Sequence, residues 1–116
     1  MLMTQTQPAV RRLPGTWVVR AAGAVLGETE TALELTEANG LTQVYFPEAD
    51  LALAFFERSP RRIASDLGGT MQYFDIIGRN GAMAEAAWTH EAAQDRAARL
   101  TGHIAFDTQR VAVERV

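Results

Sequence analysis

The side chains that could carry chemistry in this sequence are two histidines, two serines and the carboxylates. His90 and His103 lie 13 residues apart, which matches no helical spacing and no recognised ligand pattern, so we expect no metal site. Ser59 precedes a proline and indicates the end of a helix. Ser65 would need a base to act as a nucleophile, and His103 is the base we consider. Because no Gly-x-Ser-x-Gly elbow is present, a serine–histidine enzyme is only the lesser alternative.

The types of polar residue in this sequence favour a binding site over a catalytic site. An arginine suits carboxylates and phosphates because its guanidinium donates in pairs, and a buried tyrosine must satisfy its hydroxyl. Our first hypothesis is a site for a small polar or anionic molecule in a cleft between two sheets. No cofactor is expected, and whether the protein is an enzyme stays open. The predicted ligand-binding residues are Arg20, Glu34, Tyr45, Tyr73 and His103.

The second hypothesis is a protein-interaction or homodimerisation module without catalytic activity. Its support is the N-terminal segment and the alanine-rich, weakly polar stretch 82–98. Apolar residues left exposed outside the core, such as Leu53 or Phe56, would mark the interface. A pocket lined by converging polar groups would favour the first hypothesis, whereas a flat apolar patch would favour the second.

The composition excludes several classes of protein. The chain has 116 residues, enough for one domain, and no cysteine, which excludes disulfides and thiolate metal sites. All 11 basic residues are arginines, so neither a Schiff-base lysine nor a P-loop is available. A net charge of −3 argues against nucleic acid and anionic membranes as partners. The longest strongly apolar run is Leu51–Phe56, far below the roughly 20 residues of a membrane span. Residues 1–8 are largely polar and uncharged, without the basic and apolar regions of a secretory signal, so we predict a cytoplasmic protein.

The pattern of apolar residues predicts a mostly β (α+β) fold. Residues 1–14 lack periodicity and predict a partly ordered arm, followed by a single domain over 15–116. Acidic residues after Pro47 and apolar residues spaced by four predict a helix near 48–57. Alanine favours helix over 82–100, but Trp88 and a preceding turn favour strand, so we predict a strand over 83–90, with Trp88 largely buried, and a short helix near 93–100. The other predicted strands are 17–20, 24–37, 42–46, an edge strand 61–66, 70–77 before a hairpin loop at 78–81, and a last hairpin of 103–106 with 110–113.

The first hairpin determines where Arg20 points. A three-residue loop at Ala21–Gly23 would pair Arg20 with Ala24 and place its guanidinium on a semi-buried apolar face. A charge there needs a partner. That partner is either an internal group such as Glu34 or a ligand carboxylate or phosphate, and both alternatives stay open.

Several stretches resemble one bacterial family. These are TWVVRAAGAVLGETETALELTE, VYFPEADLALAFFERS, YFDI, AAW and GHIAFDTQRVAV. Together they are similar, in order and spacing after residue 15, to the domain of unknown function 427 family, which is sometimes labelled nucleotidyltransferase-like. The resemblance implies a single tent-like domain in which two small antiparallel sheets lean together, and it implies no established reaction.

The chain departs from this family before the strand that begins at Thr70. Many members read Cys-Pro-aromatic-Lys-Gly-Thr, whereas this chain reads Ser65-Asp66-Leu67-Gly68-Gly69-Thr70. The thiol and the amine that could carry chemistry are therefore absent. Nucleotidyl transfer also requires closely placed carboxylates that hold Mg²⁺, and the sequence shows no such constellation.

Overall fold

A computed structural model of the chain describes residues 8–116, which fold mostly into β-strands, as predicted. Three short 3₁₀ turns accompany the strands: η1 (Glu48–Asp50), η2 (Leu53–Phe55) and η3 (Asp95–Leu100). The strands are β1 (Ala9–Arg12), β2 (Trp17–Ala21), β3 (Ala24–Thr29), β4 (Leu33–Thr36), β5 (Thr42–Pro47), β6 (Phe56–Ala64), β7 (Thr70–Gly78), β8 (Gly81–Glu91), β9 (His103–Phe106) and β10 (Ala112–Arg115).

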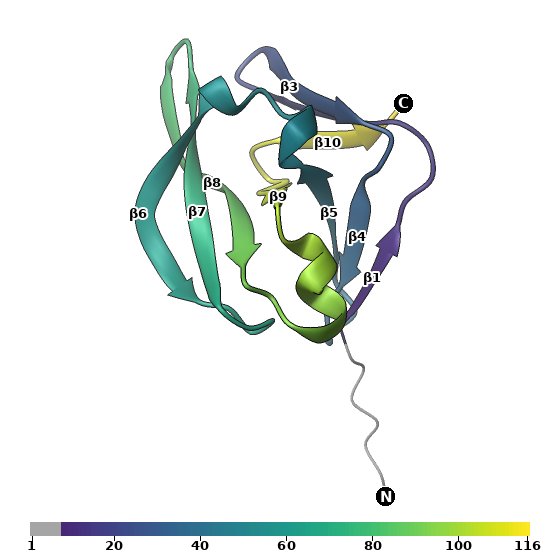
Figure 1. Cartoon of the computed structure of the whole chain (residues 1–116). Coiled ribbons are helices and arrows are strands. Elements are labelled where there is room, and N and C mark those ends of the chain that lie inside the picture. Colours follow the sequence, from purple (N-terminus) through teal and green to yellow (C-terminus); the bar gives the residue numbers. More distant parts are fainter. Residues whose placement is uncertain (1–7) are drawn as a thin grey trace, which may run out of the picture.

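The strands form two antiparallel sheets, a seven-stranded sheet in the order β1-β4-β5-β9-β8-β7-β6 and a three-stranded sheet in the order β10-β2-β3 (Figure 1). Within the large sheet, β9 is short and pairs at two positions with β5 and at two with β8. It therefore joins two limbs, a first limb of β1, β4 and β5 and a second limb of β6, β7 and β8. The tent-like arrangement of two sheets is confirmed, with one sheet larger than predicted.

Each face of the large sheet packs on a separate apolar cluster. The first cluster joins the large sheet to the small one through residues such as Val19, Phe46 and Phe106. The second cluster lies on the opposite face, where η3 contributes Leu100 and β5 contributes Tyr45. Trp88 packs against this second cluster and is partly buried, so its predicted burial is confirmed in part.

The predicted helix at 48–57 is wrong. Its place is taken by η1 and η2, because Ala52 donates its backbone N–H to Leu26 of β3 and so pairs with the small sheet instead of with its own turn. Phe56 then starts β6 and packs edge-on against Phe74 and Phe106. The predicted edge strand at 61–66 is consequently longer, and Ser59 lies inside it.

The predicted strand over 24–37 divides into β3 and β4, which belong to different sheets. The break has a local cause, because Thr29 Oγ1 accepts the backbone N–H of Thr31 at 3.0 Å and donates to Asp50 at 2.7 Å.

The last predicted hairpin is also wrong. Asp107 accepts the backbone N–H of Val111 in a turn, and the chain then crosses to the small sheet, where β10 pairs with β2.

The predicted register of the first hairpin is wrong as well. Ala22 and Gly23 both have positive φ and form a two-residue loop, so Arg20 pairs with Val25 and a bulge follows at Val19. Arg20 therefore lies on the exposed side of the small sheet.

The remaining predicted elements can be compared with the structure one by one. The strands at 17–20, 42–46, 70–77, 83–90 and 103–106 and the loop at 78–81 are confirmed, and the short helix near 93–100 is η3. Of the predicted arm, residues 9–12 form β1 and pair with β4, whereas residues 1–7 lie outside the described part of the chain.

We predict that Gly69→Ala destabilises the fold more than Gly40→Ala. Both glycines have positive φ, which costs an alanine about 1–2 kcal/mol. A Cβ on Gly69 would in addition lie 2.0 Å from the Glu91 carbonyl oxygen, whereas one on Gly40 meets nothing within 4 Å. Displacing β8 should cost about 1–3 kcal/mol more. Urea unfolding measures the difference, and equal losses for the two variants would contradict the packing described here.

Candidate functional site

Three polar side chains from distant parts of the sequence form a hydrogen-bonded chain. Ser65 Oγ lies 2.7 Å from His90 Nδ1, and His90 Nε2 lies 2.9 Å from the Tyr45 hydroxyl. Trp88 Nε1 donates to the same hydroxyl at 3.3 Å. Since Tyr45 belongs to β5 and His90 to β8, this chain connects the two limbs of the large sheet.

Local structure places each member of the chain. Trp88 and His90 are two residues apart on β8, so both face the second cluster, as Tyr45 does. Ser65 follows β6 in a tight turn in which its backbone N–H donates to Gly69 and its Oγ accepts the N–H of Leu67 at 3.0 Å. The Leu67 carbonyl accepts the N–H of Gln94, which anchors the turn next to η3.

Burial keeps the inner groups uncharged. Tyr45 is 1% exposed and His90 is 7% exposed. Burial raises the pKa of the Tyr45 phenol far above its usual range, and burial lowers the pKa of His90, which the nearby Asp66 carboxylate only partly offsets. At pH 7 the phenol and the imidazole are therefore both neutral.

The donors and acceptors then favour one tautomer of His90. Because Trp88 donates to the Tyr45 oxygen, the phenol must place its own proton elsewhere, and His90 Nε2 is the acceptor within reach. His90 Nδ1 then carries the hydrogen and donates to Ser65 Oγ. The other tautomer would leave a buried phenol proton without an acceptor, at a cost of about 1–3 kcal/mol.

This arrangement defines the chemistry of Ser65. Its oxygen accepts two hydrogen bonds, from Leu67 N–H and from His90 Nδ1–H, so its own O–H is free to donate. His90 Nδ1 already carries a proton and cannot take another from the serine. Ser65 is thus a positioned hydrogen-bond donor and not an activated nucleophile.

A cleft of about 490 Å³ opens beside this chain. Ser65 and His90 are part of its wall, and Glu37 and Asp66 are the ionisable side chains that line it with His90. The remaining lining is Pro8, Ala38, Asn39, Ile63, Ala64, Leu67 and Met71. A second hollow of about 400 Å³ adjoins it and shares Pro8, Asp66 and Leu67.

Of the five predicted site residues, Tyr45 alone belongs to this site. Arg20 pairs with Glu114 on the exposed side of the small sheet, so the internal partner is Glu114 and not Glu34. Glu34 instead pairs with Arg11 at 2.8 Å.

The other two predicted residues also lie apart from the cleft. Tyr73 is half-buried beside Trp88, under the guanidinium of Arg61. His103 Nδ1 lies 3.1 Å from the Thr101 carbonyl oxygen. The predicted partner of Ser65 is therefore the wrong histidine, because the turn between β6 and β7 places Ser65 beside His90 near the end of β8 and not beside β9.

Sequence reasoning missed His90 as a site residue. The available signal was the spacing of His90 from Trp88, since two residues that are two positions apart in a strand lie on the same face of the sheet. The predicted location between the two sheets is also not where the described cleft lies. A hollow of about 140 Å³ does lie between the sheets, lined by residues that include Trp17, Val44 and Val113.

Over 8–116, no three His, Asp or Glu side chains come together in a way that could hold a metal ion. No helix of that range is long and apolar enough to cross a membrane.

These features define a small, mostly β protein with a polar cleft at one end of its large sheet. Residues 9–116 match the model of the family described as domain of unknown function 427, so the chain belongs to this family. No curated protein matches the chain.

We predict that acid destabilises the protein through His90. Because burial lowers the pKa of His90 in the fold, the unfolded chain binds its proton at higher pH than the folded chain does. The free energy of unfolding is therefore at its full value above the ordinary histidine pKa of 6.5, and it decreases as the pH falls below 6.5. Each unit of lowering corresponds to about 1.4 kcal/mol. Urea unfolding between pH 7.5 and 5.5 measures this, and His90→Gln should flatten the dependence, whereas His103→Gln should retain it.

We also predict that His90 is protonated on Nδ1 and not on Nε2 at pH 7. Nitrogen chemical shifts of the imidazole ring distinguish the two states, and comparison with His90→Gln assigns the signals. Protonation on Nε2 would show that the phenol proton goes elsewhere and that Ser65 donates to His90, which would contradict the site chemistry derived above.

Proposed function

We propose that the protein binds a small polar molecule in the cleft beside Ser65 and His90. The observation that carries this proposal is the hydrogen-bonded chain from Tyr45 through His90, which ends at a serine hydroxyl in the wall of an open cleft. Linked hydrogen bonds polarise one another, so this hydroxyl is a better donor than an isolated serine. The neutral, already protonated His90 Nδ1 favours binding over catalysis by Ser65.

The combination of wall groups supports the same proposal. Ligand sites are concave, and a few polar groups in a mostly apolar lining set the orientation of the ligand. Here Ile63, Leu67 and Met71 supply the apolar surface and Ser65 supplies the directed donor. A cytoplasmic location stays a prediction, which cell fractionation would test.

A screen of small polar fragments by ¹H–¹⁵N NMR tests the proposal. We expect saturable shift changes at residues that line the cleft, and about tenfold weaker binding by Ser65→Ala, since a hydrogen bond contributes about 0.5–1.5 kcal/mol. Thr101→Ala is the matched control because it removes an exposed hydroxyl outside the cleft lining. The proposal fails if no fragment perturbs the cleft, or if the hits bind Ser65→Ala as tightly as the wild type.

The alternative function is homodimerisation, favoured by an apolar rim elsewhere on the molecule. Val25, Leu53 and Phe55 are 53%, 45% and 37% exposed, and the backbone bond from Ala52 to Leu26 brings their segments together. A hollow of about 450 Å³ next to this rim includes Phe55 in its wall. Sedimentation over a range of concentrations separates the two functions, because a pure dimerisation module would associate and would leave the cleft unperturbed by every fragment.

A further inference from the structure

The charges around the cleft restrict which polar molecule it can take. Glu37 and Asp66 are carboxylates in its wall, and the described residues that line it include no arginine. The adjoining hollow, which shares Asp66, is lined by one arginine, Arg96, and one further carboxylate, Asp95. The Asp66 carboxylate lies close enough for its charge to act on His90.

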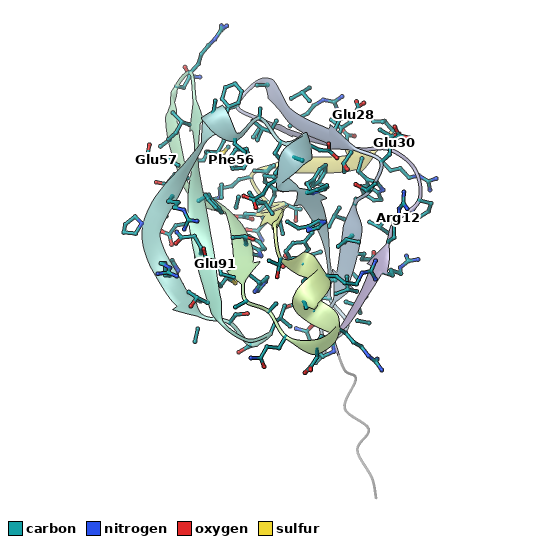
Figure 2. The ribbon with its side chains drawn as sticks, in the orientation of Figure 1. Arg12, Glu28, Glu30, Phe56, Glu57 and Glu91 are labelled. Carbon is teal, nitrogen blue, oxygen red and sulfur yellow. The ribbon has the colours of Figure 1, made fainter. Side chains whose placement is uncertain are left out.

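The arginines of the adjacent strand β6 have partners elsewhere. Arg58 and Arg62 both pair with Glu91, and Arg61 pairs with Glu85. Glu91 is labelled on β8 in Figure 2, where it is the next residue after His90, and alternation along the strand turns it to the other face of the sheet. Arg58 and Arg62 therefore do not compensate the two carboxylates of the cleft. Arg61 lies over the Tyr73 ring, on the same face as Trp88, and its charge is paired with Glu85.

The hydrogen-bonding groups narrow the ligand further. Ser65 has one O–H to donate, because its oxygen already accepts from Leu67 and His90. Asn39 Oδ1 accepts the backbone N–H of Leu41 at 3.0 Å, which leaves the Asn39 NH₂ group as a second donor. Among the described side chains that line the cleft, the carboxylate oxygens of Glu37 and Asp66 are the charged acceptors. A matching ligand offers an acceptor to Ser65 and, beside it, N–H groups to the carboxylates.

We infer that the cleft takes a small carbonyl compound with adjacent N–H or ammonium groups, namely an amide or an α-amino amide, and excludes carboxylates and phosphates. The carbonyl oxygen accepts from Ser65, and the nitrogen donates to Glu37 or Asp66. The body of the ligand lies against the apolar wall. This inference rests on the proposed function and replaces the anionic ligand that the sequence suggested through Arg20.

Three compounds with one carbon skeleton test the inference: propionamide, its isosteric anion propionate, and the cationic L-alaninamide. NMR titrations at pH 7 follow the residues that line the cleft. We expect saturable binding of propionamide, at least threefold tighter binding of L-alaninamide, and no saturable shift with propionate.

Two sets of variants identify the groups responsible. Glu37→Gln combined with Asp66→Asn should remove the advantage of L-alaninamide over propionamide. Glu57→Gln should retain the advantage of L-alaninamide. Glu57 is an exposed acid near the start of β6, whereas Ser65 follows the end of this strand (Figure 2). Ser65→Ala should weaken both amides about tenfold, and a wild-type-like spectrum of each variant establishes that it is folded.

The outcomes separate this inference from the proposed function. If propionate binds as well as propionamide, or if the Glu37 and Asp66 changes leave L-alaninamide unaffected, the inference is wrong and the cleft is still a binding site. If none of the three compounds perturbs the cleft while other fragments do, the inference is wrong but the proposed function still stands. If no fragment of any class perturbs it, the proposed function fails as well.

Discussion

The Tyr45 hydroxyl joins the two limbs of the large sheet. Within residues 8–116, β9 is the strand that connects the limbs through backbone pairing, and it makes two residue pairs on each side. Side chains must therefore hold the limbs together, and Tyr45 of β5 does so by bonding to Trp88 and His90 of β8. Because Tyr45 and His90 are buried and Trp88 is partly buried, each polar atom needs its partner, and one missing bond would leave another unsatisfied.

This same requirement fixes the protons at the site. Trp88 can only donate, so the phenol donates to His90, and His90 donates to Ser65. The hydrogen bond between Tyr45 and His90 inside the sheet thus determines which tautomer His90 adopts, and this tautomer leaves the Ser65 O–H free to donate at the surface. The consequence is that His90, the residue that resembles a catalytic base, is already committed as a donor.

Local patterns predicted much of the fold. Alternation and turn residues predicted the β7–β8 hairpin with its loop at 78–81 and the strand that contains Trp88, against the helix propensity of its alanines. The patterns failed where a distant segment competed for the same backbone groups. The apolar spacing of Leu51 and Phe55 is helical, but the backbone of Ala52 bonds to β3. Likewise, residues 24–37 alternate throughout, yet the Thr29 side chain ends the strand and sends β4 to the other sheet.

The sequence by itself determined the class of fold, the family, and the absence of thiol and amine chemistry, because these follow from residue types and local periodicity. It directed attention to Tyr45, since a tyrosine in a buried strand must satisfy its hydroxyl, whereas the ligand-binding role predicted for Tyr45 stays a prediction. Only the tertiary structure decided that this hydroxyl meets His90, that Arg20 faces solvent, and that carboxylates line the cleft. The physical reason is that each depends on strand register and on which strands become neighbours. A slip of one residue reverses the face of a side chain, and pairing between strands far apart in sequence leaves no local signal.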